Sequence, residues 1–104
     1  MTTAQIAETI KDNCKNHIWQ EYDSDGYQEF DIYGTTAHIE WHISLSAYLD
    51  ITEDYNGGGK IVTHLQSAVC DIDEITLLSS ETGEELTDQP LYDMLNREWR
   101  FRYY

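Results

Sequence analysis

Residues 39–51 have the sequence IEWHISLSAYLDI, in which every second residue from Ile39 to Ile51 is apolar. The residues between them are mostly polar, and together with His38 they would form the opposite face. An alternation with a period of two over this length indicates a β-strand that buries one face and exposes the other. The sequence therefore predicts one long strand here.

Two further strands are expected on either side of this segment. Residues 27–33 also alternate, and a break at Gly34-Thr35 would let a short hairpin pair them with the long strand. Residues 69–79 alternate too, but the pattern slips at Asp73-Glu74, where a β-bulge would return the apolar side chains to one face. Residues 61–65 fit either a short strand or an extended connection.

Helical patterns lie toward both ends of the chain. Thr2 and Gln5 have the spacing of a capping box, and apolar residues then recur at every fourth position, which predicts a helix to about Asn16. Residues 87–90 carry the signal of a second helix start, and residues 91–99 follow with apolar side chains at helical spacing.

Length and composition fit a single α+β domain over residues 1–104. Its 40% hydrophobic and 12% aromatic residues indicate a folded chain and exclude an acidic disordered tail. The predicted architecture is an N-terminal helix, a three- to four-stranded antiparallel sheet and a C-terminal helix. There is no leader-like segment and no apolar run of about 20 residues. With only Cys14 and Cys70, we expect a cytoplasmic protein with two reduced, half-buried thiols and no membrane contact.

The charge of the chain is strongly unbalanced. It has 20 acidic and 6 basic residues and a net charge of −14, and between Lys15 and Arg97 the only basic residue is Lys60. Such a charge favours basic protein surfaces or cations as partners and argues against direct binding to nucleic acid. Solubility alone needs a net charge of only about 2 to 8 in magnitude in a small domain.

His38, Glu40 and His42 would lie on one face of the long strand and form a candidate metal site. Alternate residues of a strand are about 6.7 Å apart, so the two histidines would be about 13 Å apart at the backbone. All three could share an ion only across a bend, and a solvated polar face is the favoured interpretation. The histidines are otherwise scattered and neither cysteine has basic surroundings, so we expect no catalytic residue and no enzyme activity.

A second candidate cation site is the turn after the first helix. Glu21, Asp23, Asp25 and Gly26 match the first positions of an EF-hand calcium loop, but the last ligand position falls on Ile32. An acidic turn is therefore the favoured interpretation. We expect neither a metal nor a cofactor.

Acidic residues also recur at strand spacing. Glu29 with Asp31, and Asp71 with Asp73, would be about 6.7 Å apart, which is of the same order as the spacing of phosphates along a nucleic-acid strand. A protein built in this way can occupy a basic groove made for DNA or RNA. The alternative is that the acids provide solubility and keep edge strands unpaired. The predicted acidic partner-binding residues are Asp23, Asp25, Glu29, Asp31, Glu53, Asp54, Asp71, Asp73, Glu81, Glu84 and Glu85.

The C-terminal segment differs from the rest, because all three arginines lie there among aromatic residues. Arginine and aromatic side chains dominate interface hot spots. One interpretation is a docking patch of Arg97, Trp99, Arg100 and Phe101, which would bind another protein or a second copy as a homo-oligomer. The other is that the aromatic residues close the core while the arginines complement the end of the helix.

In size, charge and order of elements, the chain resembles small acidic accessory proteins of phages and mobile elements. The amphipathic first helix and the acidic turn at residues 22–26 belong to this resemblance. Some anti-restriction and anti-CRISPR inhibitors of this class act as nucleic-acid mimics. The resemblance implies a binding protein that presents carboxylates to a basic protein, such as a DNA- or RNA-processing enzyme. The alternative is a small structural or assembly module that docks through its C-terminal segment.

Overall fold

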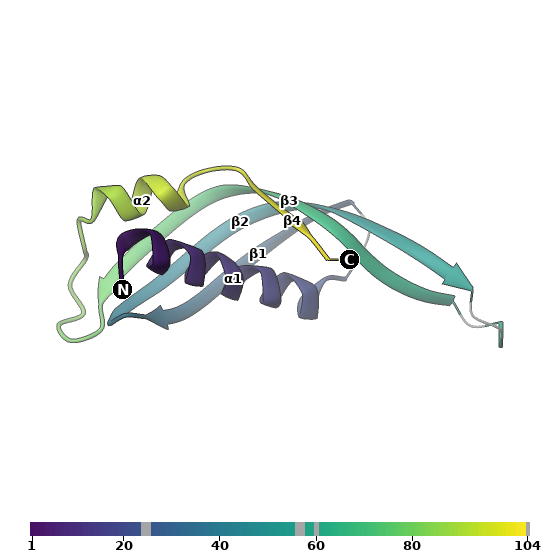
Figure 1. Ribbon diagram of the computed structural model, residues 1–104, viewed down its shortest axis with the longest axis horizontal. Coiled ribbons are helices and arrows are strands. Elements are labelled where there is room, and N and C mark those ends of the chain that lie inside the picture. The colour runs from purple at the N-terminus through teal and green to yellow at the C-terminus, as the bar shows by residue number, and fades with distance from the viewer. Residues whose placement is uncertain (24–25, 56–57, 60, 104) are drawn as a thin grey trace.

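In the computed structural model, a four-stranded antiparallel sheet with the strand order β1-β2-β3-β4 carries both helices on one face (Figure 1). Along the chain the elements are α1 (Thr3–Glu21), β1 (Gly26–Thr36), β2 (Ile39–Tyr55), β3 (Ile61–Ser79), α2 (Gln89–Leu95) and β4 (Trp99–Arg102). The predicted α+β class, N-terminal helix and antiparallel sheet are confirmed. The structure describes residues 1–23, 26–55, 58–59 and 61–103, without the side chains of 54, 55, 61 and 62.

Helix α1 begins at the predicted capping box. The Thr2 hydroxyl accepts a hydrogen bond from the Gln5 backbone N–H (3.2 Å), and the Gln5 side-chain oxygen accepts one from the Thr2 backbone (2.9 Å). The helix continues to Glu21, beyond the predicted end near Asn16, because Ile18 extends its buried apolar row by one more turn. Among the described residues, neither helix combines the length and apolarity that crossing a membrane requires.

Strand β2 confirms the alternation on which the prediction depended. The apolar side chains at every second position from Ile39 to Leu49 are at most 8% exposed, whereas Tyr48 and Asp50 are exposed. Burial of apolar surface contributes about 25 cal/mol per Å², so this face is a main source of stability. Leu49 is the last residue of β2 that pairs with β1. Beyond it, β2 pairs with β3 alone and forms a projecting ribbon (Figure 1). Residues 61–65 are therefore strand.

The predicted break at Gly34-Thr35 is wrong. Strand β1 continues to Thr36, and the chain reverses at Ala37 and His38, which both have left-handed backbone angles (φ 49° and 64°). Two such residues form the kind of tight hairpin whose twist matches that of the flanking strands. Gly34 lies opposite Trp41 instead, and a Cβ at this position would clash with the Trp41 indole.

The predicted bulge at Asp73-Glu74 is confirmed. Ser44 of β2 pairs with Glu74 of β3, but the next residue, Leu45, pairs with Ile72, so that Asp73 is the extra residue. As a result, Asp73 and Glu74 are both exposed on the face away from the helices. The bulge thus adds a carboxylate to that face while Ile72 still packs against the core.

The C-terminal helix is present but shorter than predicted. Helix α2 ends at Leu95, and Trp99 belongs to β4, where it pairs with Cys70 of β3. In β4, Trp99 and Phe101 are buried while the intervening Arg100 is exposed. This period of two fits a strand, and pairing with β3 satisfies the backbone groups that a longer helix would have bonded internally.

The two thiols are fully buried, not half-buried as expected. Cys14 on α1 and Cys70 on β3 are both free and 0% exposed. Burial disfavours the charged thiolate and raises the pKa of each thiol to about 12. Thiolate chemistry at these cysteines is therefore suppressed in the folded state.

Replacement of Gly34 by alanine tests the contact with Trp41. Because the added Cβ would clash with the buried indole ring, we expect the Gly34→Ala variant to lose about 1–3 kcal/mol in free energy of unfolding. The neighbouring exposed residue supplies the control, since Thr35→Ala should change stability by no more than about 0.5 kcal/mol. Urea denaturation followed by tryptophan fluorescence measures both; equal midpoints for the two variants would contradict the close approach.

The buried thiols predict slow alkylation of the native protein. At about pH 8, iodoacetamide should modify neither Cys14 nor Cys70 at an appreciable rate, because both carry a pKa far above this pH. In guanidinium chloride both pKa values should return to about 8.5 and both residues should react. Mass spectrometry of the two samples measures the difference, and rapid modification of the folded chain would refute the burial.

Candidate functional site

The sheet face opposite the helices, called here the open face, is strongly acidic. Its side chains alternate with the core residues along β1, β2 and β3, so one-sided burial leaves them exposed. The lysine and arginine side chains that the described residues place on this face are Arg100 and Arg102, both at the β4 edge. Seven exposed carboxylates lie on it: Glu29, Asp31, Glu40, Asp50, Asp71, Asp73 and Glu74.

The centre of the open face consists of two serines of β2 with carboxylates on both sides. Ser46 lies between Glu29 on β1 and Asp71 on β3. Ser44 lies between Asp31 on β1 and Glu74 on β3. Because neighbouring strands are about 4.8 Å apart, the carboxylates flanking each serine are separated by about 10 Å at the backbone. Four acidic side chains therefore flank a patch only three strands wide.

Three hydroxyl groups orient three of these carboxylates. Hydrogen bonds run from Ser44 Oγ to Asp31 (2.5 Å), from Ser46 Oγ to Asp73 (2.6 Å) and from Tyr27 Oη to Glu29 (2.6 Å). A hydrogen bond to the ionised form favours that form. The hydrogen bond from Ser44 and, as the second cause, the one with His42 accordingly lower the pKa of Asp31. The hydrogen bond that the Tyr27 hydroxyl donates to Glu29 raises the pKa of Tyr27. Asp31 is thus held in its charged state.

Asp31, His42 and Ser44 form a cluster that sequence analysis missed. His42 Nε2 lies 3.2 Å from Asp31 Oδ1 and 3.4 Å from Ser44 Oγ, and the His42 ring stacks on Tyr33 with ring centroids 4.1 Å apart. Only the pairing register of β1 and β2 brings these residues together. In a catalytic relay the carboxylate and the nucleophile contact different imidazole nitrogens, whereas here both contact Nε2. The cluster orients a carboxylate rather than activating the serine.

The candidate metal site on β2 is not assembled. His38 lies in the hairpin turn with a left-handed backbone, so it does not continue the strand face of Glu40 and His42. In the described part of the chain, no group of three or more His, Cys, Asp or Glu side chains is placed to hold a metal ion. Of the EF-hand-like turn, Glu21 ends α1, and Asp25 lies outside the described residues.

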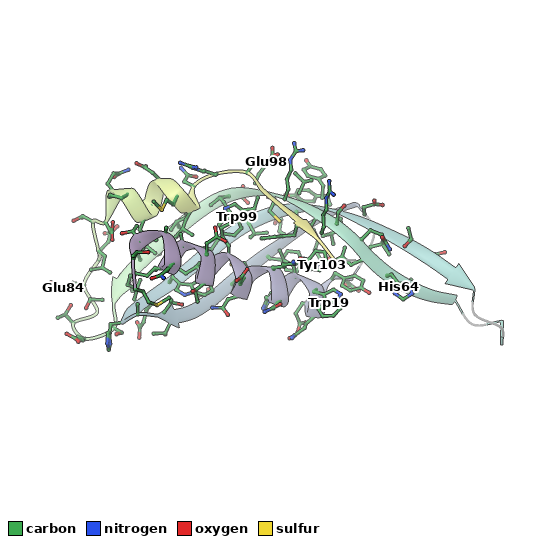
Figure 2. All side chains as sticks on the ribbon, in the orientation of Figure 1. Trp19, His64, Glu84, Glu98, Trp99 and Tyr103 are labelled. Carbon is green, nitrogen blue, oxygen red and sulfur yellow. The ribbon has the colours of Figure 1, made fainter. Side chains whose placement is uncertain are left out.

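The predicted acidic residues separate into distinct regions. Glu29, Asp31, Asp71 and Asp73 meet on the open face. Asp23 follows α1, Glu53 lies on the projecting ribbon, and Asp54 also belongs to β2, but its side chain is outside the description. The remaining acids lie in the loop between β3 and α2, at the end of the molecule where Figure 2 labels Glu84: Glu81, Glu84 and Glu85.

The structure adds Glu40, Asp50 and Glu74 to the open face. The sequence contained the signal for Glu40 and Asp50, because both occupy the polar positions of the alternating β2 pattern. Glu74 joins them only because the bulge places it and its neighbour on the same side. A strictly alternating strand would have turned one of the two toward the core.

The C-terminal segment contributes mainly to the core. Trp99 and Phe101 are 2% and 8% exposed and belong to the hydrophobic core together with residues of α1 and the sheet (Trp99 is labelled in Figure 2). Arg97 Nε donates a hydrogen bond to the Asp93 carbonyl oxygen near the end of α2 (3.2 Å). Of the predicted docking patch, only Arg97 and Arg100 are therefore exposed.

Comparison of the chain with protein-family models, with curated proteins and with solved structures gave no match. The resemblance to acidic phage and mobile-element proteins therefore stays a prediction. Inference about function depends on the chemistry of the open face.

Removal of the Ser44 hydroxyl tests how the carboxylate of Asp31 is kept charged. In Ser44→Ala the pKa of Asp31 should rise toward the ordinary aspartate value of about 3.9, because the main stabilising hydrogen bond is lost. Ser46→Ala is the matched control, since the Ser46 hydroxyl donates to Asp73 and not to Asp31. Carboxyl ¹³C chemical shifts followed through an acid titration measure both variants, and an unchanged Asp31 pKa in Ser44→Ala would exclude the hydroxyl as its cause.

Proposed function

We propose that this chain is a non-enzymatic binding protein that presents the carboxylates of its open face to a basic surface of a protein partner. The observation that supports this is the gathering of seven exposed carboxylates on one face of three adjacent strands. Arg100 and Arg102 are confined to the far edge of that face, so they leave its centre negative.

Such a gathering is unfavourable for the isolated protein. Two like charges about 7 Å apart repel each other by about 0.6 kcal/mol even in bulk water. Dispersed acids would provide the same solubility without this cost. The hydroxyl groups of Tyr27, Ser44 and Ser46 support the clustered charges, and a basic partner would remove the repulsion between them.

The specific partner we propose is the nucleic-acid-binding surface of a DNA- or RNA-processing enzyme. Alternate carboxylates along β1 have a spacing similar to that of successive phosphates, and β3, on the other side of β2, supplies a second acidic row. A basic groove that binds such an array gains electrostatic steering and strong salt dependence, as it does with nucleic acid. The protein would then act as an inhibitor that occupies the groove.

The alternative, an assembly module that docks through the C-terminal segment, has less surface available. Trp99 and Phe101 are in the core, and the Arg100 guanidinium is already paired with Glu98 at 2.8 Å. This alternative predicts contacts that survive high salt and fail in Arg100→Ala. The open-face proposal instead predicts contacts that are lost at high salt and that survive in Arg100→Ala.

Paired charge reversal tests the proposal. The variant Glu29→Lys with Asp31→Lys should lose the proteins that the wild type captures from a host lysate, because it inverts the charge of β1 on the open face. Glu81→Lys with Glu84→Lys changes the net charge by the same amount, but in the loop between β3 and α2, so this control should keep them. Capture at about 50 mM and about 500 mM salt, read by mass spectrometry, should show that binding is lost at high salt.

Competition with duplex DNA or RNA tests the more specific part of the proposal, which is that the partner surface also binds nucleic acid. Nucleic acid should displace the captured proteins from the wild type if both occupy one groove. Equal capture by the two double variants would exclude the open face as the binding surface. Capture that depends on the open face but resists nucleic acid would retain a basic partner and exclude mimicry.

A further inference from the structure

The open face has a hollow at its hairpin end. Its volume is about 490 Å³, and it lies over two neighbouring rows of cross-strand pairs on β1, β2 and β3. The side chains that line it differ from those at the centre of the face, because aromatic, aliphatic and acidic groups meet here. The residues that line it include Tyr33, Glu40, His42, Thr76 and Leu78.

An aromatic pair forms one wall of the hollow. The rings of Tyr33 and His42 stack with centroids 4.1 Å apart and planes 6° apart, and the bond of His42 to Asp31 holds this pair in position. Tyr33 nevertheless remains 71% exposed. The ring face that does not stack on His42 is therefore available to a partner, and the ring needs little reordering before binding.

Glu40 supplies a carboxylate without a partner. It lies on β2 between Thr35 of β1 and Leu78 of β3, and its side chain is exposed. Within residues 1–23, 26–55, 58–59 and 61–103, Glu40 makes no hydrogen bond or ion pair, in contrast to Glu29 and Asp31. Both of its oxygens are free to accept hydrogen bonds from a cation.

Half-buried side chains of β3 complete the hollow. Leu78 and Thr76 pair with Glu40 and His42, respectively, and present methyl groups beside the polar ones. A ligand that fits has a positive, planar end and an apolar stem. Arginine combines these properties: its guanidinium stacks on aromatic rings and binds carboxylates with two parallel hydrogen bonds, while its methylene groups cover apolar surface.

We propose that this hollow binds an arginine side chain of the basic partner and makes the open face selective for arginine over lysine. This inference rests on the proposed function, because it names the side chain by which the partner is anchored. Lysine carries the same charge, but its compact ammonium neither stacks on Tyr33 nor forms a two-pronged bond with Glu40. Selectivity thus comes from the hollow, whereas the carboxylates at the centre of the face attract either residue.

Two peptides of equal charge test the inference. Fluorescence anisotropy would measure binding of labelled hexa-arginine and hexa-lysine at one fixed ionic strength. We expect hexa-arginine to bind the wild type roughly fivefold more tightly, and Tyr33→Leu to remove this preference while leaving hexa-lysine unchanged. Tyr48→Leu is the matched control, since Tyr48 is another exposed tyrosine of the open face (56%), outside the hollow, and the preference should persist.

A second variant and a second measurement localise the effect. Glu40→Gln removes the charge but keeps the shape, and it should weaken hexa-arginine more than hexa-lysine. Amide ¹H–¹⁵N spectra should shift around Tyr33, Glu40 and Leu78 when hexa-arginine is added. The same spectra show that each variant is folded.

The outcomes separate this inference from the proposed function. Equal affinities for the two peptides, or a preference that survives Tyr33→Leu, would overturn the arginine site. If both peptides still weaken in Glu29→Lys with Asp71→Lys, two residues beside Ser46 that do not line the hollow, the acidic open face keeps its proposed role. A Tyr33-dependent preference for hexa-arginine that ignores this charge reversal would support the hollow and count against the wider acidic surface.

Discussion

The structure depends on the burial of one face of β2 beneath the helices. Every second side chain from Ile39 to Leu49 enters the core with the apolar row of α1, and Trp41 packs over Gly34 of the neighbouring strand. Since side chains alternate strictly, covering one face forces the intervening residues of the same strands onto the other. The acidic open face is thus the other side of the hydrophobic core, and β1, β2 and β3 each supply both core residues and carboxylates.

The two faces of the sheet have opposite effects on the stability of the fold. Apolar burial favours the sheet, while the carboxylates on its outer face repel one another. Hydroxyl groups on the same face donate hydrogen bonds to three of these carboxylates, and the bond from Ser44 favours the ionised form of Asp31. Asp31 keeps its charge at lower pH than an isolated aspartate would, because Ser44 and His42 bond to its carboxylate. The repulsion among the clustered carboxylates is relieved when a basic partner binds.

The features that the sequence predicts correctly are those that depend on residues close together in the chain. The capping box of α1, the alternation of β2 and the bulge on β3 were evident from neighbouring residues, because local spacing determines each of them. The turn at Ala37-His38 was missed, since the sequence contains a glycine three residues earlier that serves the Trp41 ring instead. The C-terminal strand was missed because its pairing with β3 outweighs a helical spacing of apolar residues.

By itself the sequence determined the α+β class, the strand faces and the excess of negative charge, all of which follow from periodicity and composition. The tertiary structure decided which charges act together: it combined Glu29 and Asp31 with acids forty residues away on β3, and left those of the β3–α2 loop apart. It also joined Tyr33, Glu40 and Leu78 around one hollow. The reason is that cross-strand neighbours are specified by pairing register, which is a property of the whole sheet and is absent from any short segment of the chain.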